Sequence, residues 1–402
     1  MNLGFPLCRQ PRHEERIREA LEACVQFLTE RVGSPTLVAV ILTGSFARGE
    51  GSVLPVGAAL KVLGDFEFFV VLTDADRRAR QLGVWSHEAT ARLATRGVRV
   101  DVEFGPVDPG FFGARARPSI FVYDLVHHGK VLWGRPDLLD GIPRFGAEAI
   151  PREDALHLMF NRTVEQLEAY ERLGRLDADG VLDAAYQQLK VTLDVAGSAL
   201  AFTGNHTALY RRRPAAFARL LAETPSLQAA LPAGFPDDVA HAAVAKTSPA
   251  EHFATPTGAA MAEQREWVRR RIVAAIPAVT GMLAWELTRA LGRPGTLDEL
   301  LDRYARSRPL PRRVWDWAKF VLNPRMSPLP ISHVRAGRLF LKSTPRALLY
   351  VAATLAYRQL GRAATSDPIG RLLPLPRSLE PRDAAARRQA IVALWRWCVR
   401  NA

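Results

Sequence analysis

The chain has 402 residues, 48% of them apolar, and a formal net charge of +13 at pH 7. This length exceeds what one hydrophobic core usually supports, so we expect two or three domains. The three cysteines, Cys8, Cys24 and Cys398, have no metal-ligand spacing and no disulfide framework, which argues against a disulfide-rich secreted scaffold and a structural zinc domain.

The N-terminal residues lack the apolar core of a signal peptide. No window reaches the roughly 18 apolar residues that are needed to span a bilayer. We therefore expect a soluble protein of the reducing cytoplasm, without a transmembrane segment.

The first predicted elements are an amphipathic helix over residues 14–31 and a buried strand over residues 37–43. Apolar residues recur at helical spacing in the first segment, and the second, LVAVILT, is a continuous apolar run. The strand leads directly into Gly44 and Ser45 and a short helical stretch, residues 46–48. That order directs backbone N–H groups and a hydroxyl toward an anion.

Two acidic pairs follow on the next predicted strands. Asp65 and Glu67 stand at the start of an apolar run, and a side-chain period of two puts both carboxylates on one face. Residues 98–104 alternate in the same way and place Asp101 and Glu103 together on one face. Carboxylates so arranged can hold Mg²⁺ ions against a triphosphate, which makes these four residues a candidate catalytic site.

A Gly-Ser after a strand, an acidic pair on the next strand and a further carboxylate on a later one resemble the DNA polymerase β-type nucleotidyltransferase superfamily. The string GSFARG, residues 44–49, is similar to the version found in minimal and aminoglycoside nucleotidyltransferases. The resemblance implies that the Gly44 backbone, Ser45 and Arg48 bind the nucleotide phosphates.

The same resemblance implies a metal site of Asp65, Glu67 and Asp101, which would hold two Mg²⁺ ions. Asp101 would complete that site or act as the base. Glu103 shares a face with Asp101 and stays open as the alternative third carboxylate.

The implied fold is α+β: a nucleotidyltransferase domain with a small mixed sheet over residues 1–145, followed by a largely helical C-terminal region. Residues 120–134 resemble the helix and short strand that close this domain. Nineteen residues separate Ser45 from Asp65, more than in compact family members. Residues 49–63 are rich in Gly and Pro and are therefore predicted to form an inserted surface loop, which could act as a lid over the nucleotide.

Apolar residues at helical spacing predict a helical bundle domain over residues 150–235 and an additional helical, Arg-rich region over residues 240–402. From residue 331 onward there are thirteen Arg or Lys against three Asp or Glu. Such a segment can contact nucleic acid, an anionic membrane surface or an acidic protein, and a solvated Arg-rich helical face is at least as good an interpretation.

A helix predicted over residues 181–202 carries Lys190 away from its core face. The resemblance implies that this lysine reaches across the cleft to the nucleotide phosphates. The alternative is an i,i+4 ion pair with Asp194. Arg211, Arg212 and Arg213 are weaker candidates for the same phosphate-binding role.

Two further groups of residues suggest a function but have simpler interpretations. His127 and His128 fit a helix C-terminal cap or partial burial better than catalysis. Four tryptophans among arginines could stack on bases or lie at a membrane surface, but a core position is the better prediction: Trp315, Trp317, Trp395 and Trp397.

The predicted function is Mg²⁺-dependent transfer of a nucleoside monophosphate from an NTP, with ATP favoured, to a hydroxyl of a small molecule or protein, releasing pyrophosphate. The sequence identifies neither the base nor the acceptor. Transfer to a nucleic-acid end stays open, with weak support from the basic C-terminus. A non-catalytic nucleotide-binding scaffold or sensor also stays open, although the presence of every expected carboxylate argues against it.

Overall fold

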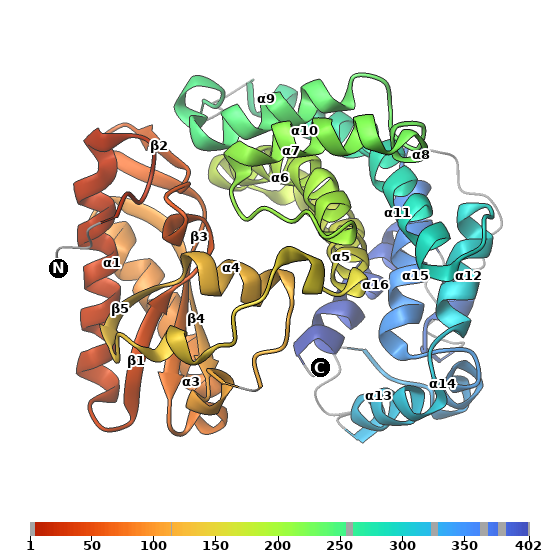
Figure 1. Cartoon of the computed structure of the whole chain (residues 1–402), viewed down its shortest axis with the longest axis horizontal. Coiled ribbons are helices and arrows are strands. Elements are labelled where there is room, and N and C mark those ends of the chain that lie inside the picture. The colour runs from red at the N-terminus through yellow and green to blue at the C-terminus, as the bar shows by residue number, and fades with distance from the viewer. Residues whose placement is uncertain are drawn as a thin grey trace. The chain divides into compact units, whose positions relative to one another are not determined.

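The computed structural model describes residues 5–113, 115–254, 260–322, 329–361, 369–376 and 383–400 (Figure 1). It confirms the α+β class, with a mixed helix and sheet region at the N-terminus followed by a largely helical region. The chain divides into two compact units. Unit 1 comprises residues 1–154, 185–218 and 236–255, and unit 2 comprises residues 155–184, 219–235 and 256–402.

This division follows different boundaries from the three consecutive domains that the sequence predicted. Two helical segments, residues 185–218 and 236–255, belong with the N-terminal sheet in unit 1. The reason is a set of buried polar contacts from those helices to the sheet region, described below.

Unit 1 contains a five-stranded mixed sheet of order β2-β3-β1-β5, with β4 also paired to β3. The strands are β1 (Leu37–Leu42), β2 (Val53–Val56), β3 (Ala59–Leu72), β4 (Val98–Val107) and β5 (Lys130–Gly134). The β3 and β4 strands are parallel and the other pairs are antiparallel.

Helices cover both faces of this sheet (Figure 1). Helices α1 (Pro11–Val32) and α3 (Ala75–Thr95) pack on one face against Phe66, Phe68 and other strand residues. Helix α4 (Ile120–His128) packs on the other face. Burial on both sides explains why β1 is a continuous apolar run.

The prediction of a surface loop over residues 49–63 is wrong. Residues 53–62 form an antiparallel hairpin of β2 with the first part of β3, turning at Gly57, whose φ is +60°. Val53 and Leu54 are buried, so apolar burial holds this segment in the sheet and it cannot act as a lid.

Apart from the first, which directly follows β1 in the sheet region, the remaining helices belong to the helical part of the chain. They are α2 (Gly44–Ala47), α5 (Arg152–Arg172), α6 (Ala178–Phe202), α7 (Arg213–Glu223), α8 (Pro225–Gln228), α9 (Phe235–Thr247), α10 (Ala260–Ala274), α11 (Ile276–Leu291), α12 (Leu297–Arg306), α13 (Leu310–Leu322), α14 (His333–Phe340), α15 (Pro345–Arg358) and α16 (Ala384–Arg400). In unit 2, Phe160 of α5 stacks on Tyr350 of α15 with ring centroids 4.9 Å apart, and it also contacts Tyr304 of α12. These rings join three helices in one core.

Among the described residues, one stretch, Ala260–Leu291, has the length and apolar composition to cross a membrane. It consists of two helices, α10 and α11, that meet at Ala275. Half of its most apolar window is buried within the protein, which is also the character of a core helix.

A buried lysine ties α9 to the chain just before β2. Lys246 is 1% exposed, and its Nζ donates to the carbonyl oxygen of Glu50 and to Ser52 Oγ, both at 3.2 Å. The Ser52 hydroxyl also bonds Tyr186 Oη of α6 at 2.8 Å. Burial lowers the pKa of Lys246 to about 7.

This lowered pKa makes stability depend on pH. The unfolded lysine keeps its proton up to about pH 10, whereas the folded one releases it near neutrality, so the free energy of unfolding should rise with pH in this window by up to ~1.4 kcal/mol per unit. Lys246→Met should remove this pH dependence when the free energy of unfolding is measured by urea denaturation at several pH values between neutrality and about pH 10. An exposed control, Lys342→Met, should leave the slope intact, and equal slopes in all three proteins would contradict the assignment.

Candidate active site

The parallel pairing of β3 and β4 brings the two predicted acidic pairs together. Asp65 lies opposite Asp101 in the strand register, and Glu67 lies opposite Glu103. Residues paired across parallel strands point to the same face, so all four carboxylates share the face opposite Phe66. Asp101 and Glu103 are exposed, whereas Asp65 and Glu67 are partly buried.

Glu67 is held beneath the Gly-Ser turn that follows β1. Gly44 has φ +68°, a backbone conformation that favours glycine, and a Cβ atom there would lie 2.5 Å from Glu67 Oε2, so the Glu67 carboxylate would have to move. The Thr43 N–H donates to the Glu67 carbonyl oxygen at 2.9 Å. Burial and the charge of Asp65 raise the pKa of Glu67 to about 7. A cation bound nearby would therefore stabilise the ionised form of this carboxylate.

Two positive charges act on the pKa of this carboxylate. The ammonium of Lys190, on the unit 1 part of α6, and the guanidinium of Arg48 both act to lower the pKa of Glu67, against the larger effect of burial. Asp194, the alternative partner predicted for Lys190, accepts from Arg213 Nη1 at 3.3 Å. The phosphate-binding role that the resemblance implied for Lys190 stays a prediction.

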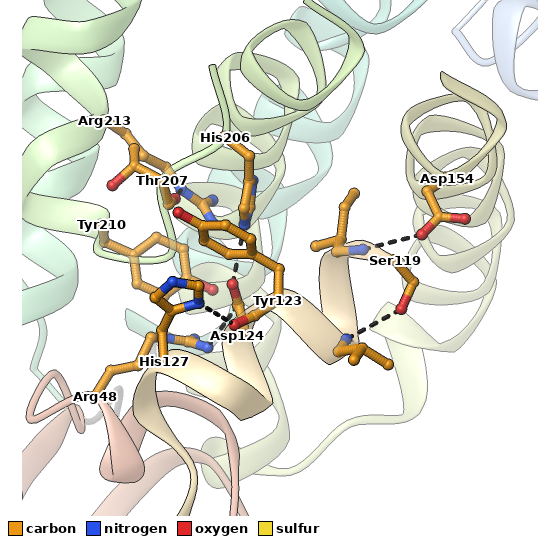
Figure 2. A network of polar contacts seen from close by, with 12 residues as sticks. Arg48, Ser119, Tyr123, Asp124, His127, Asp154, His206, Thr207, Tyr210 and Arg213 are labelled. Carbon is orange, nitrogen blue, oxygen red and sulfur yellow. Dashed lines mark hydrogen bonds and ion pairs between the residues drawn. The ribbon is translucent and has the colours of Figure 1, made fainter. Parts of the chain in front are cut away.

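Arg48 is held by partners that the sequence analysis did not identify (Figure 2). Its Nη1 donates to Asp124 Oδ2 at 3.0 Å, and the other oxygen of that carboxylate lies 2.9 Å from His206 Nε2. The Arg48 guanidinium also lies over the Tyr210 ring, 5.3 Å from its centroid. The Arg48 side chain is 9% exposed, so its charge is fixed in place.

The charge of Asp124 is stabilised by this network. Burial alone would raise its pKa, but the hydrogen bond from His206 and the charges of Arg48 and Arg213 hold the pKa of Asp124 below its usual value. Asp124 lies in the segment that resembled the family's closing helix, and no pattern in the sequence pointed to it or to His206.

Glu50 and Arg213 complete the attachment of the later helices to the sheet region. The fully buried Glu50 carboxylate accepts the backbone N–H groups of Tyr210 and Arg211 at 2.9 and 3.1 Å. Arg213 donates to the carbonyl oxygen of Leu193 and packs on the Tyr210 ring. Arg213 is buried in structural contacts, which account for its charge without a phosphate.

A pocket enclosing about 300 Å³ of open space lies between the Gly-Ser turn and α4. Its lining includes Gly44, Arg48, Glu67, Asp124 and His128. The Ser45 hydroxyl, next to Gly44, has no hydrogen-bond partner among the residues that the structure describes.

The two adjacent histidines lie differently. His127 Nδ1 bonds the carbonyl oxygen of Tyr123 at 2.8 Å, as expected of a side chain at a helix C-terminus. His128 instead lines the pocket, and burial lowers its pKa.

Within the described residues, no three His, Cys, Asp or Glu side chains converge on a point that could hold a metal ion. Mg²⁺ bound with a nucleotide commonly takes only one or two protein carboxylates, its other ligands being phosphate oxygens and water. Asp65 and Glu67 fit that mode. Partial desolvation and the charge of Asp65 raise the pKa of Glu103, although much of its side chain is exposed. Asp101 lies opposite Asp65 in the strand register, so both residues stay candidates for the third carboxylate.

Comparison of the chain with protein-family models, with curated proteins and with solved structures finds no match.

Gly44→Ala should destabilise the protein by about 1–3 kcal/mol, because it combines a strained backbone with displacement of the Glu67 carboxylate. Gly57→Ala is the matched control: Gly57 has φ +60° but nothing within 4 Å of an added Cβ. Urea denaturation should show a clearly larger loss for Gly44→Ala, and equal losses would contradict the proposed contact with Glu67.

Asp124→Asn should cost about 3–5 kcal/mol of unfolding free energy, because it leaves the buried Arg48 charge without its partner. Asp137→Asn removes the carboxylate of an exposed ion pair with Arg135 and should leave stability unchanged within error. A small effect of Asp124→Asn in the same chemical denaturation experiment would show that the network contributes little.

Proposed function

We propose that this protein is an Mg²⁺-dependent nucleotidyltransferase that moves a nucleoside monophosphate from an NTP, with ATP favoured, to a hydroxyl group and releases pyrophosphate. The observation that carries the proposal is the environment of Glu67. Its carboxylate lies against the Gly44 turn and near Asp65, it lines one pocket with Arg48, and the positive charges of Lys190 and Arg48 favour its ionised form.

Asp65 and Glu67 would hold the metal, which supplies Lewis-acid polarisation of the α-phosphate when bound. The raised pKa of Glu67 fits this role, because metal binding would displace the proton that this carboxylate holds near neutrality. Without a cation, two adjacent carboxylates in this position repel each other.

The triphosphate would be bound at the Gly-Ser turn. The Ser45 hydroxyl and the backbone N–H groups of the turn are donors for phosphate oxygens, and Lys190 neutralises part of their charge. Arg48 lines the same pocket but is already bonded to Asp124, so its contribution is a fixed positive charge.

Asp101 or Glu103 would accept the proton of the acceptor hydroxyl. Both lie on β4 beside Asp65 and Glu67, and both are exposed to an incoming acceptor. In-line attack of the hydroxyl oxygen on the α-phosphorus then breaks the bond to the bridging oxygen, and pyrophosphate leaves.

A second candidate is a non-catalytic nucleotide-binding scaffold or sensor. The observation that favours it is that no three acidic side chains converge among the described residues. A scaffold would bind an NTP without consuming it.

The test is pyrophosphate release from each of the four NTPs with Mg²⁺, for the wild type and Asp65→Asn. We expect release with at least one NTP and a loss of about 100-fold or more in the variant, because the substitution removes a metal ligand. Asp108→Asn, an exposed carboxylate just beyond β4, should keep full activity.

Binding should be measured alongside, by calorimetry with the same nucleotides. Mg²⁺-dependent binding without turnover would favour the scaffold. Full activity of Asp65→Asn would remove this residue from the mechanism.

A further inference from the structure

The buried side chain of His206 makes a single hydrogen bond within the described residues, and that bond is to Asp124 (Figure 2). The imidazole is 1% exposed, its Nε2 lies 2.9 Å from Asp124 Oδ1, and its Nδ1 is buried without a partner. Because an ionised carboxylate can only accept hydrogen bonds, Nε2 carries the proton and is the donor. The transfer reaction proposed above gives this histidine no role.

The Asp124 carboxylate is divided between two donors. Its Oδ2 accepts from Arg48 Nη1 at 3.0 Å, and its Oδ1 accepts from His206. A carboxylate and a guanidinium otherwise tend to pair through two parallel hydrogen bonds, which occupy both oxygens and two of the nitrogens. His206 therefore limits the pair of Asp124 and Arg48 to one hydrogen bond.

This single hydrogen bond leaves donors of Arg48 unused. Within the described residues the side chain donates only from Nη1, and its Nε is buried without a partner. Arg48 also lines the pocket that contains Gly44 and Glu67. A buried N–H without an acceptor costs free energy, and a phosphate oxygen bound in this pocket would supply the acceptor.

We propose that His206 is a positioning residue for the NTP site: by occupying Asp124 Oδ1, it keeps Nε and Nη2 of Arg48 available to the triphosphate. This inference rests on the nucleotide-binding part of the proposed function, because the anion concerned is the triphosphate at the Gly44 turn. Arg48 then contributes directed hydrogen bonds as well as its charge. Without His206, Asp124 would bind a second nitrogen of Arg48 and compete with the triphosphate for it.

Two substitutions separate the hydrogen bond of His206 from the bulk of its ring. A glutamine side chain places an N–H near the position of the imidazole Nε2, whereas the shorter asparagine amide lies near the position of Nδ1. Both substitutions remove the ring that packs edge to face on Tyr123, with centroids 5.2 Å apart. His206→Asn and His206→Gln therefore differ in the contact to Asp124. His206→Leu, which has no donor, is a second variant that removes this contact.

The test is the binding of inorganic tripolyphosphate to the full-length protein, measured by calorimetry in the presence of Mg²⁺. We expect saturable binding of one tripolyphosphate by the wild type. The dissociation constant should rise about tenfold in His206→Asn and in His206→Leu, the change that follows from losing about 1.4 kcal/mol. His206→Gln should restore binding to near the wild-type value. His87→Asn, at an exposed histidine of α3, should leave binding unchanged.

Melting temperatures should be measured first, so that affinities are compared between folded proteins. If one of the two removal variants is unfolded, the other supplies the comparison. Wild-type affinity in the removal variants would overturn the proposal. An equal loss in His206→Gln would overturn it as well, because it would show that the ring has only a structural role. No saturable binding of tripolyphosphate by the wild type would also contradict it.

Pyrophosphate release by the wild type, measured separately, distinguishes this inference from the proposed function. Release by the wild type together with unchanged tripolyphosphate affinity in the removal variants would leave the transfer reaction intact and exclude His206. Weakened tripolyphosphate binding in the removal variants, rescued in His206→Gln, without any pyrophosphate release by the wild type would contradict the transfer reaction and support the role of His206.

Discussion

The candidate site depends on the close approach of the Glu67 carboxylate to the Gly44 backbone, where an added Cβ atom would lie 2.5 Å from Glu67 Oε2. This contact joins the turn after β1 to the central strand β3, and it places a partly buried acid next to a second acid. A carboxylate in that position is costly unless a cation or proton compensates it. The charges of Lys190 and Arg48 favour the ionised form of this carboxylate, and the charge of Asp65 opposes it.

Buried polar groups and their hydrogen-bond partners also determine which segments of the chain belong to unit 1. Glu50 receives two backbone N–H groups from the segment that begins α7, Lys246 reaches back to Glu50 and Ser52, and Arg48 pairs with Asp124. Each of these contacts joins the sheet region to another part of the chain. A buried polar group needs its partners, so the helices that supply them are held in unit 1.

Local sequence patterns predicted the parts of the site that lie on regular strands. The run before Gly44 is a strand buried on both faces, and the period of two placed Asp65 with Glu67 and Asp101 with Glu103 on shared faces. The hairpin over residues 53–62 was missed, because its Gly and Pro content obscured the buried alternation that holds it in the sheet. The partners of Arg48 could not be predicted, since Asp124 lies 76 residues away in sequence and His206 lies 82 residues beyond Asp124. Periodicity identifies the apolar face of a helix, but it does not say which distant element that face will meet.

The most direct test of the account is a crystal structure with Mn²⁺ and a non-hydrolysable ATP analogue, with the metal located by its anomalous scattering. The account predicts a metal peak bound to the carboxylates of Asp65 and Glu67, with phosphate oxygens against the Gly44 and Ser45 turn. A metal and nucleotide bound elsewhere would contradict this prediction. So would a nucleotide bound at this turn with no metal bound to Glu67.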